Sequence, residues 1–219
     1  MKILTTLISL FFLCSALLMT APEKYLKTYH SNGQLQNSIS IKENKKDGPL
    51  LSYFEDGKIA VKGFFKKDKR DKQWIFYDKD TGKISAIENY KDGLLEGQQY
   101  YYHKNGKIRT KGEYKADERT GFWQVYDEDG NLEMQNIFLD GEKVVSVAMY
   151  EPNGMISSSG FLKNGQREGE WKYFDEEGAL LYDVTYENGV RNGEWKAYTK
   201  DGKILITGFY NNGVILGLE

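Results

Sequence analysis

Short aromatic and aliphatic segments alternate with turn-forming segments along the chain from about residue 25 onward. Glycines mark one set of these turns, and they are Gly33, Gly57, Gly82, Gly106, Gly130, Gly154, Gly178 and Gly202. Successive members, called the turn glycines below, are 24 residues apart, except that one extra residue before Gly82 makes a single interval of 25. A fixed period over most of a chain indicates one supersecondary unit used repeatedly.

Apolar residues recur at fixed distances from the turn glycines. Four residues before each glycine, or five at the insertion, stand Tyr29, Tyr53, Tyr77, Tyr102, Tyr126, Tyr150, Phe174 and Tyr198. Two residues after it stand Leu35, Ile59, Ile84, Ile108, Leu132, Ile156, Leu180 and Ile204. Eight residues after it stand Ile41, Phe65, Tyr90, Tyr114, Phe138, Leu162, Tyr186 and Tyr210. We expect these three sets to form one continuous packed face.

Residues 169–193, GEWKYFDEEGALLYDVTYENGVRNG, represent the unit. A short aromatic strand leads into an acidic turn, and a second strand leads into a turn built on Asn188 and Gly189. Asn and Gly tolerate the positive φ of tight hairpin turns, so the unit is predicted to be an antiparallel hairpin. Single hairpins are marginal in water, whereas stacked hairpins share one ladder and one apolar face.

The predicted fold class is therefore all-β, an elongated antiparallel sheet of about eight stacked hairpins. The array occupies residues 22–219, with approximate copies 25–48, 49–72, 73–97, 98–121, 122–145, 146–169, 170–193 and 194–219. The first copy lacks Trp and several glycines, which is typical of an end cap. Val145 replaces a glycine between copies five and six, so a bend or a longer continuous strand is expected there.

Four tryptophans occupy one position of the repeat, and they are Trp74, Trp123, Trp171 and Trp195. They have the opposite strand parity to the aromatic residues before the turn, which predicts that they point to the other face. In one interpretation each Trp covers a glycine of a neighbouring strand, at Gly63, Gly112, Gly160 or Gly208. In the other they form an exposed row that binds a partner, with Trp171 and Trp195 as the leading candidates.

The first residues are predicted to form an export signal. Ile3 to Ala21 contains no charged residue and follows Lys2, which is the layout of a secretory signal peptide. An uncleaved membrane anchor is the alternative, because the segment approaches the roughly 20 residues that span a bilayer. Lipid modification of Cys14 is a weaker alternative, since Leu13 precedes it. We expect an exported protein in the periplasm, at the cell surface or secreted, with membrane contact only through this segment.

Composition argues against several functions. The 30 Lys and Arg balance 32 Asp and Glu, so the basic excess of a nucleic-acid-binding protein is missing. Cys14 is the only cysteine, which excludes a disulfide framework or a thiolate metal site in the array. His30 and His103 are interpreted as solvent-exposed turn residues, and the acidic pairs at the turns as solvated carboxylates. We therefore expect no catalytic residue, no metal site and no cofactor.

The repeats resemble MORN repeats, specifically the bacterial variant class. Residues 101–123, YYHKNGKIRTKGEYKADERTGFW, and residues 198–213, YTKDGKILITGFYNNG, match that class in register. The resemblance implies a hairpin array that serves as a scaffold for protein or membrane contacts, and some relatives carry an antitoxin label. The leading hypothesis is a non-catalytic scaffold at the cell envelope that binds an unknown protein. The alternatives are a cell-wall glycan-binding module and an antitoxin-like inhibitor of a partner protein.

Overall fold

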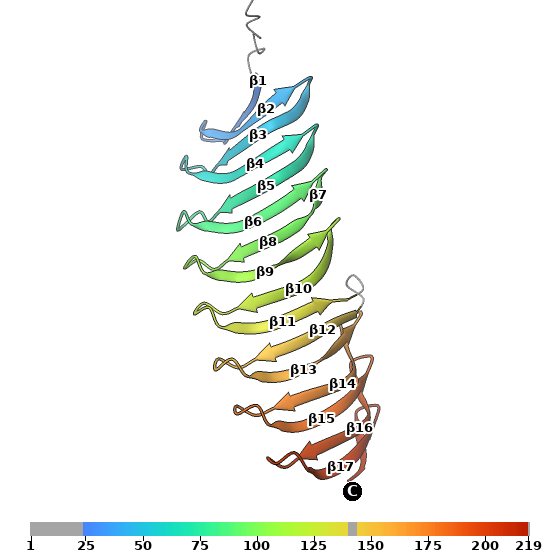
Figure 1. Cartoon of the computed structure of the whole chain (residues 1–219). Helices are drawn as coiled ribbons and strands as arrows, with labels where there is room; N and C mark the ends of the chain where they lie inside the picture. The colour runs from blue at the N-terminus through green and yellow to red at the C-terminus, as the bar shows by residue number, and fades with distance from the viewer. Residues whose placement is uncertain (1–23, 140–143, 219) are drawn as a thin grey trace, which may run out of the picture.

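The structure, a computed structural model, describes residues 24–139 and 144–218 and forms a single antiparallel sheet of 18 strands (Figure 1). In chain order the strands are β1 (Lys24–Tyr29), β2 (Leu35–Lys42), β3 (Lys45–Tyr53), β4 (Ile59–Lys66), β5 (Lys69–Tyr77), β6 (Ile84–Lys91), β7 (Leu94–Leu95), β8 (Gly97–Tyr102), β9 (Ile108–Lys115), β10 (Glu118–Tyr126), β11 (Leu132–Phe138), β12 (Val144–Tyr150), β13 (Ile156–Lys163), β14 (Gln166–Phe174), β15 (Leu180–Glu187), β16 (Val190–Tyr198), β17 (Ile204–Asn211) and β18 (Val214–Leu218).

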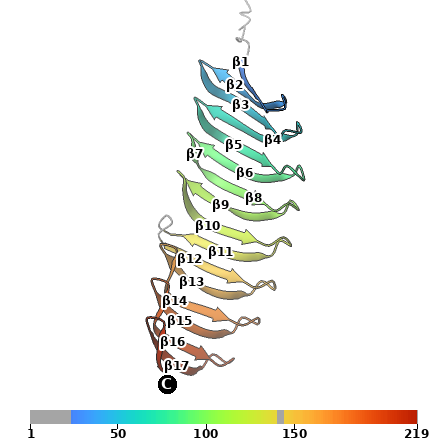
Figure 2. The same ribbon diagram turned by 180° about the vertical axis from the view of Figure 1, so that it is seen from behind.

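The strands follow one another in space as they do in sequence. Each strand pairs with the next except at the short β7, where β7 and β8 both pair with β6 and β8 then pairs with β9. The strands therefore lie in chain order from one end of an elongated sheet to the other, as the two opposite views show (Figures 1 and 2). The predicted elongated all-β repeat sheet is confirmed. Residues 3–21 lie outside the described residues.

Two kinds of turn join the strands. At the turn glycines, Gly57 N donates to Phe54 O over 2.9 Å and has φ 82°, and the other copies repeat this bond. At the opposite end, two-residue turns have positive φ at both central residues, as at Asn188 (49°) and Gly189 (83°). Such turns match the right-handed twist of paired strands. The predicted hairpin chemistry is therefore present at both ends of the unit.

Most of the long strands bend sharply at one point, called the corner below, where the regular pairing with the preceding strand is interrupted. This bend was not predicted from the sequence. Between β13 and β14 the register passes from Ser159↔Lys172 to Phe161↔Glu168, so three residues of β14 lie opposite Gly160 alone. Gly169, nine residues before the turn glycine, has φ 68° at this corner. The same interruption recurs in other copies, and the strands are visibly curved (Figures 1 and 2). The sheet thus has one layer with an inner side, defined as the side enclosed by the bend.

Val145 changes this corner as the sequence predicts. The pairing of β12 with β13 runs from Val144↔Lys163 to Met149↔Ser158 without interruption. Val145 is 7% exposed and lies in the core. A valine cannot easily adopt the positive φ that the corner requires, so the strand continues straight through. Of the two alternatives, the described part of β12 shows a continuous strand without a bend, although its seven residues are fewer than the nine of β14.

The core lies on the inner side and is built around the tryptophans. One cluster of buried residues contains Trp123, Phe138, Val147, Trp171 and Tyr186 among others, and a second contains Ile39, Leu50 and Trp74. Seven of the eight residues that stand eight positions after the turn glycines belong to these clusters, all except Ile41. The prediction that these residues share one packed face with those four before and two after each turn glycine is wrong, because the other two sets lie outside the core.

The remaining two sets of apolar residues pack less tightly. Tyr102 pairs with Ile108 and directly follows Tyr101, which packs on the core, so both lie on the outer side. Among their equivalents, Tyr29 is 59% and Ile204 55% exposed. The bulge beside each turn shifts the side-chain alternation by one residue, and this places the two sets outside the core.

Candidate functional site

Each buried tryptophan covers a glycine of the preceding strand. Trp171 is 1% exposed, and its Nε1 donates to Phe161 O over 3.0 Å. A Cβ on Gly160 would collide with the Trp171 ring, because the indole lies directly on the bare backbone. Trp74 on Gly63 and Trp123 on Gly112 repeat both features. The interpretation that Trp covers a glycine of a neighbouring strand is confirmed for these three residues, and Trp195 meets it with Gly208 of the following strand.

Trp195 differs from the other three. Val184 stands where the preceding strand would carry glycine, and the Trp195 ring lies instead against Gly208 of the following strand. Its side chain is only partly buried, and its Nε1 is enclosed without a hydrogen-bond partner. The indole is therefore displaced along the array by the extra volume of the valine.

In three copies without tryptophan, the residue at the tryptophan position is smaller and the residue at the glycine position of the preceding strand is larger. Leu50 pairs with Ile39 and Val147 with Asn136, so in these copies a residue smaller than Trp lies opposite a residue larger than glycine. Gln99 is 0% exposed, and its amide is satisfied by Asn89 N (2.9 Å), Asn89 O (3.2 Å) and Gly97 O (3.1 Å). The tryptophan position is therefore a core position from the second copy to the seventh, whereas Leu26 in the first copy is 44% exposed and Trp195 in the eighth is partly buried.

A row of arginines lies over these rings on the inner side. The row is defined by Arg70, Arg119, Arg167 and Arg191, at the start of β5, β10, β14 and β16. The guanidinium carbon lies 4.4 Å from the Trp74 ring centre in the first case, 5.1 Å from Trp123 in the second and 4.6 Å from Trp171 in the third. Arg191 lies 5.6 Å from the Tyr210 ring centre. The row was not predicted from the sequence, although its members share one position of the 24-residue period, which was a usable signal.

Tyrosine hydroxyls orient the arginines further. Arg167 Nη1 donates to Tyr173 Oη over 3.0 Å and to Tyr186 Oη over 3.1 Å. Burial and the hydrogen bond with Tyr186 raise the pKa of Tyr173. Burial alone would raise the pKa of Tyr186, but hydrogen bonds with Tyr173, Arg191 and Arg167 lower it overall. The guanidinium groups are thus held in place by rings below and by hydroxyls beside them.

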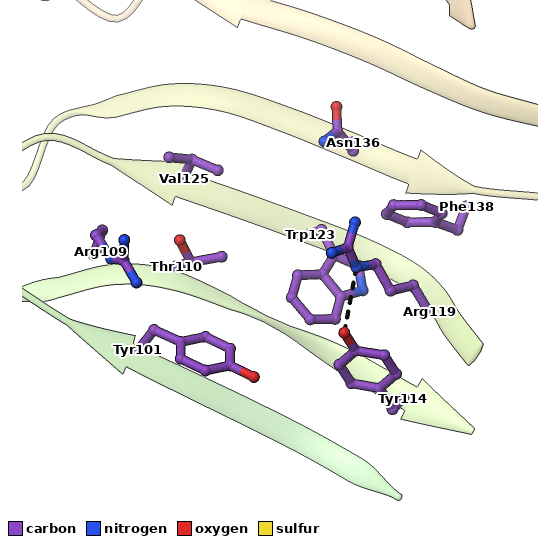
Figure 3. Close-up of a pocket in the computed structure, with 9 residues that line it drawn as sticks. All are labelled: Tyr101, Arg109, Thr110, Tyr114, Arg119, Trp123, Val125, Asn136 and Phe138. Carbon is purple, nitrogen blue, oxygen red and sulfur yellow. Dashed lines mark hydrogen bonds between the residues drawn. The ribbon is translucent and has the colours of Figure 1, made fainter. Parts of the chain in front are cut away.

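Two hollows open beside this row. One, of about 300 Å³, is lined by Tyr101, Arg109, Thr110, Tyr114, Arg119, Trp123, Val125, Asn136 and Phe138 (Figure 3). The other, of about 310 Å³, is lined by Tyr182, Val184, Arg191, Trp195, Ala197 and Tyr210. Both combine aromatic walls with a cation, which is a chemistry suited to binding rather than to catalysis.

The predicted partner-binding tryptophans are placed differently by the fold. Trp74, Trp123 and Trp171 are 3%, 5% and 1% exposed, so they do not form an exposed row. Trp123 and Trp195 do line the two hollows. Their contact with a partner stays a prediction, and it would involve only the parts of the rings that face those hollows.

The two histidines join neighbouring copies. His30 Nε2 lies 2.9 Å from Tyr53 O, and His103 Nε2 lies 2.8 Å from Tyr126 O. Both side chains are partly buried rather than fully exposed as predicted. Beside His103, Asn105 Nδ2 donates to Glu128 O over 2.7 Å. Hydrogen bonds therefore link neighbouring copies along the edge that carries the turn glycines. Within residues 24–139 and 144–218, no three His, Cys, Asp or Glu residues are grouped as metal ligands require.

Three buried or hydrogen-bonded tyrosines predict an alkaline loss of stability. Burial and then a hydrogen bond to Glu88 raise the pKa of Tyr90 to about 12, and burial and then the charge of Glu88 raise the pKa of Tyr101 to about 12 as well. A 2.6 Å hydrogen bond to Asp183, followed by burial, raises the pKa of Tyr198 to about 12.

Because the folded state holds these protons more tightly than the unfolded state, their contribution to stability is complete below the ordinary tyrosine pKa of about 10. It is lost as the pH rises from about 10 to about 12. Urea unfolding at a series of pH values should show this fall, and Tyr90→Phe with Tyr101→Phe should reduce it. A free energy of unfolding that stays constant or increases over this range would contradict the assignment.

Comparison with known proteins identifies the repeat. The family described as MORN repeat variant matches residues 46–67, 95–116, 167–188 and 191–212. The third and fourth segments begin at Arg167 and Arg191, so the matched unit starts at the arginine row. No match was found among curated proteins. No helix long and apolar enough to cross a membrane occurs in the part of the chain that the structure describes.

Two solved structures are similar in part. The crystal structures of TcdB2-TccC3-Cdc42 and TcdB2-TccC3-TEV each align with 12% identity and a TM-score of 0.23. The alignments cover 87% and 84% of this chain but 12% of the other chains, so this chain spans about an eighth of their length. The four family matches and the stacked hairpins agree with each other. The chain therefore contains four segments that match the MORN repeat variant family, within an array of stacked hairpins.

Proposed function

We propose that the chain is a non-catalytic scaffold that binds a protein partner at the bacterial cell envelope. MORN repeats are in general non-enzymatic modules that bind proteins or membranes. The observation that carries the proposal is the arginine row, which repeats on the inner side of the bend beside two aromatic hollows. Ordered arginine and aromatic side chains are the residues that dominate protein interfaces.

Affinity capture with matched variants tests partner binding. The full chain is used as bait against envelope and cytosolic fractions, beside Arg167→Gln with Arg191→Gln. The control is Lys172→Gln with Lys196→Gln, because these lysines lie on the same two strands but next to Trp171 and Trp195, with side chains on the outer side. We expect a protein that the wild type and the lysine variant retain and the arginine variant loses. Capture of only glycan, or equal capture by both variants, would contradict the proposal.

The envelope location rests on residues 3–21 alone. The uncharged segment after Lys2 predicts export, and the expected result of cell fractionation with an epitope after Glu219 is recovery outside the cytosol. Replacing Leu10 and Phe11 with Asp should return the protein to the cytosol, because charges interrupt the apolar region that export requires. A full-length protein found entirely in the cytosol would contradict this part of the proposal.

A further inference from the structure

The arginine row has a regular spacing that restricts what it can bind. We propose, building on the scaffold function above, that the row binds an extended acidic segment of the partner. The segment carries carboxylates in steps of three residues, and it runs along the array, across the strands. The inference rests on three features: the unneutralised charge at the C-terminal end of the row, the pitch of the row, and its place inside the bend.

The guanidinium groups at the C-terminal end of the row are fixed but not neutralised. Arg167 and Arg191 are oriented by aromatic rings and tyrosine hydroxyls, and among the described residues neither forms an ion pair. An arginine has five N–H donors, and carboxylates are its best-matched bidentate acceptors. An anion that binds here meets a preorganised cation and need not displace another carboxylate.

The pitch of the array matches three residues of extended polypeptide. Arg167 and Arg191 are one copy apart, which is two strands or about 9.6 Å at a strand spacing of about 4.8 Å. Three residues of an extended chain advance about 10 Å, and three of polyproline II about 9.3 Å. Arg119 and Arg70 lie two and four copies before Arg167, which correspond to six and twelve residues. A single straight segment can therefore meet every member of the row in register.

The arginine row lies inside the bend of the sheet, which favours an extended polypeptide over a membrane surface as its ligand. Arg167 begins one arm of the bent β14, and Trp171 begins the other arm, so the guanidinium group lies across the corner. A flat anionic membrane cannot follow the row into this bend, whereas a single polypeptide is narrow enough. The aromatic side chains that line both hollows add apolar contacts for the residues between the carboxylates.

The row is not uniform, and this predicts where the segment binds most strongly. Tyr90 accepts a hydrogen bond from Arg70 over 2.8 Å and donates one to Glu88 over 2.6 Å, so a carboxylate already lies near the N-terminal end. Leu95 stands where the next copy would carry arginine. The pair Arg167 and Arg191 should therefore contribute more to binding than Arg70.

Fluorescence anisotropy with synthetic peptides tests the spacing on the wild-type full chain. The probe is a labelled peptide of about 18 residues that repeats Glu-Pro-Ser, long enough to reach from Arg70 to Arg191 at about 3.1 Å per residue. The comparison peptide has the same composition with its Glu residues in one block. We expect the regular peptide to bind at least about fivefold more tightly. Equal affinity of the two peptides, or no binding of either, would overturn the inference.

Variants test the site independently of the peptide series. Arg167→Gln with Arg191→Gln should weaken binding of the regular peptide about tenfold, whereas Lys172→Gln with Lys196→Gln, which removes the same charge from the outer side, should leave it within about twofold. Equal losses would overturn the inference, as would arginine-dependent binding to phosphatidylserine vesicles without peptide binding. If the peptides fail while the arginine variant still loses the captured partner, the acidic-segment inference fails and the scaffold function stands.

Discussion

Replacing Trp171 with alanine should lower the free energy of unfolding by about 3–5 kcal/mol, the usual cost of removing a fully buried large aromatic side chain. Trp171 is 1% exposed, covers Gly160 and hydrogen-bonds to Phe161 O. Its removal leaves a cavity under Arg167 and exposes the carbonyl it satisfies. Urea unfolding monitored by circular dichroism measures the effect.

Trp195→Ala is the matched control for this substitution. Trp195 occupies the same position one copy later, but it is partly exposed and its Nε1 has no acceptor to lose. We therefore expect a clearly smaller loss of stability. Equal losses at the two positions would show that full burial and the Nε1 hydrogen bond do not determine the contribution of these tryptophans.

Gly160→Ala should be the second most damaging of these substitutions, at about 3 kcal/mol, because the added Cβ would enter the space of the Trp171 ring. The same methyl group at Gly217, where a Cβ would meet nothing within 4 Å, should have little effect. A double-mutant cycle separates the cause. In the Trp171→Ala background the cost of Gly160→Ala should largely disappear, since the two groups interact directly. Additive losses would contradict the proposed contact.

Much of this fold could be predicted from the sequence because each copy repeats the same local chemistry. The turn glycines and pairs such as Asn188 and Gly189 specify hairpins without reference to the rest of the chain. The pairing of Trp with glycine was also recognisable, since an indole needs bare backbone to lie on. A single copy would not have been enough to predict the hairpin, but the same residues recur at the same positions in several copies.

The side-chain faces were harder to predict because they depend on small irregularities in register. The bulge beside Tyr102 shifts the alternation, which separates Ile108 on the outer side from Tyr114 in the core. The corner at Gly169 depends on one positive φ, and a glycine within a strand can equally mark a bulge or a close approach of another backbone. Because the corner was not predicted, the position of the Arg167 side chain over the Trp171 ring could not be predicted either.

The central claim is that the inner side of the bent sheet binds the partner, and hydroxyl-radical footprinting of tyrosines with and without the captured partner tests it most directly. Tyr114, Tyr182 and Tyr210 are partly exposed on the inner side with the tryptophans, whereas Tyr102, Tyr126 and Tyr198 lie on the outer side as an internal control. We predict that the partner slows oxidation of the first three and leaves the other three unchanged. Protection confined to Tyr102, Tyr126 and Tyr198 would contradict the account.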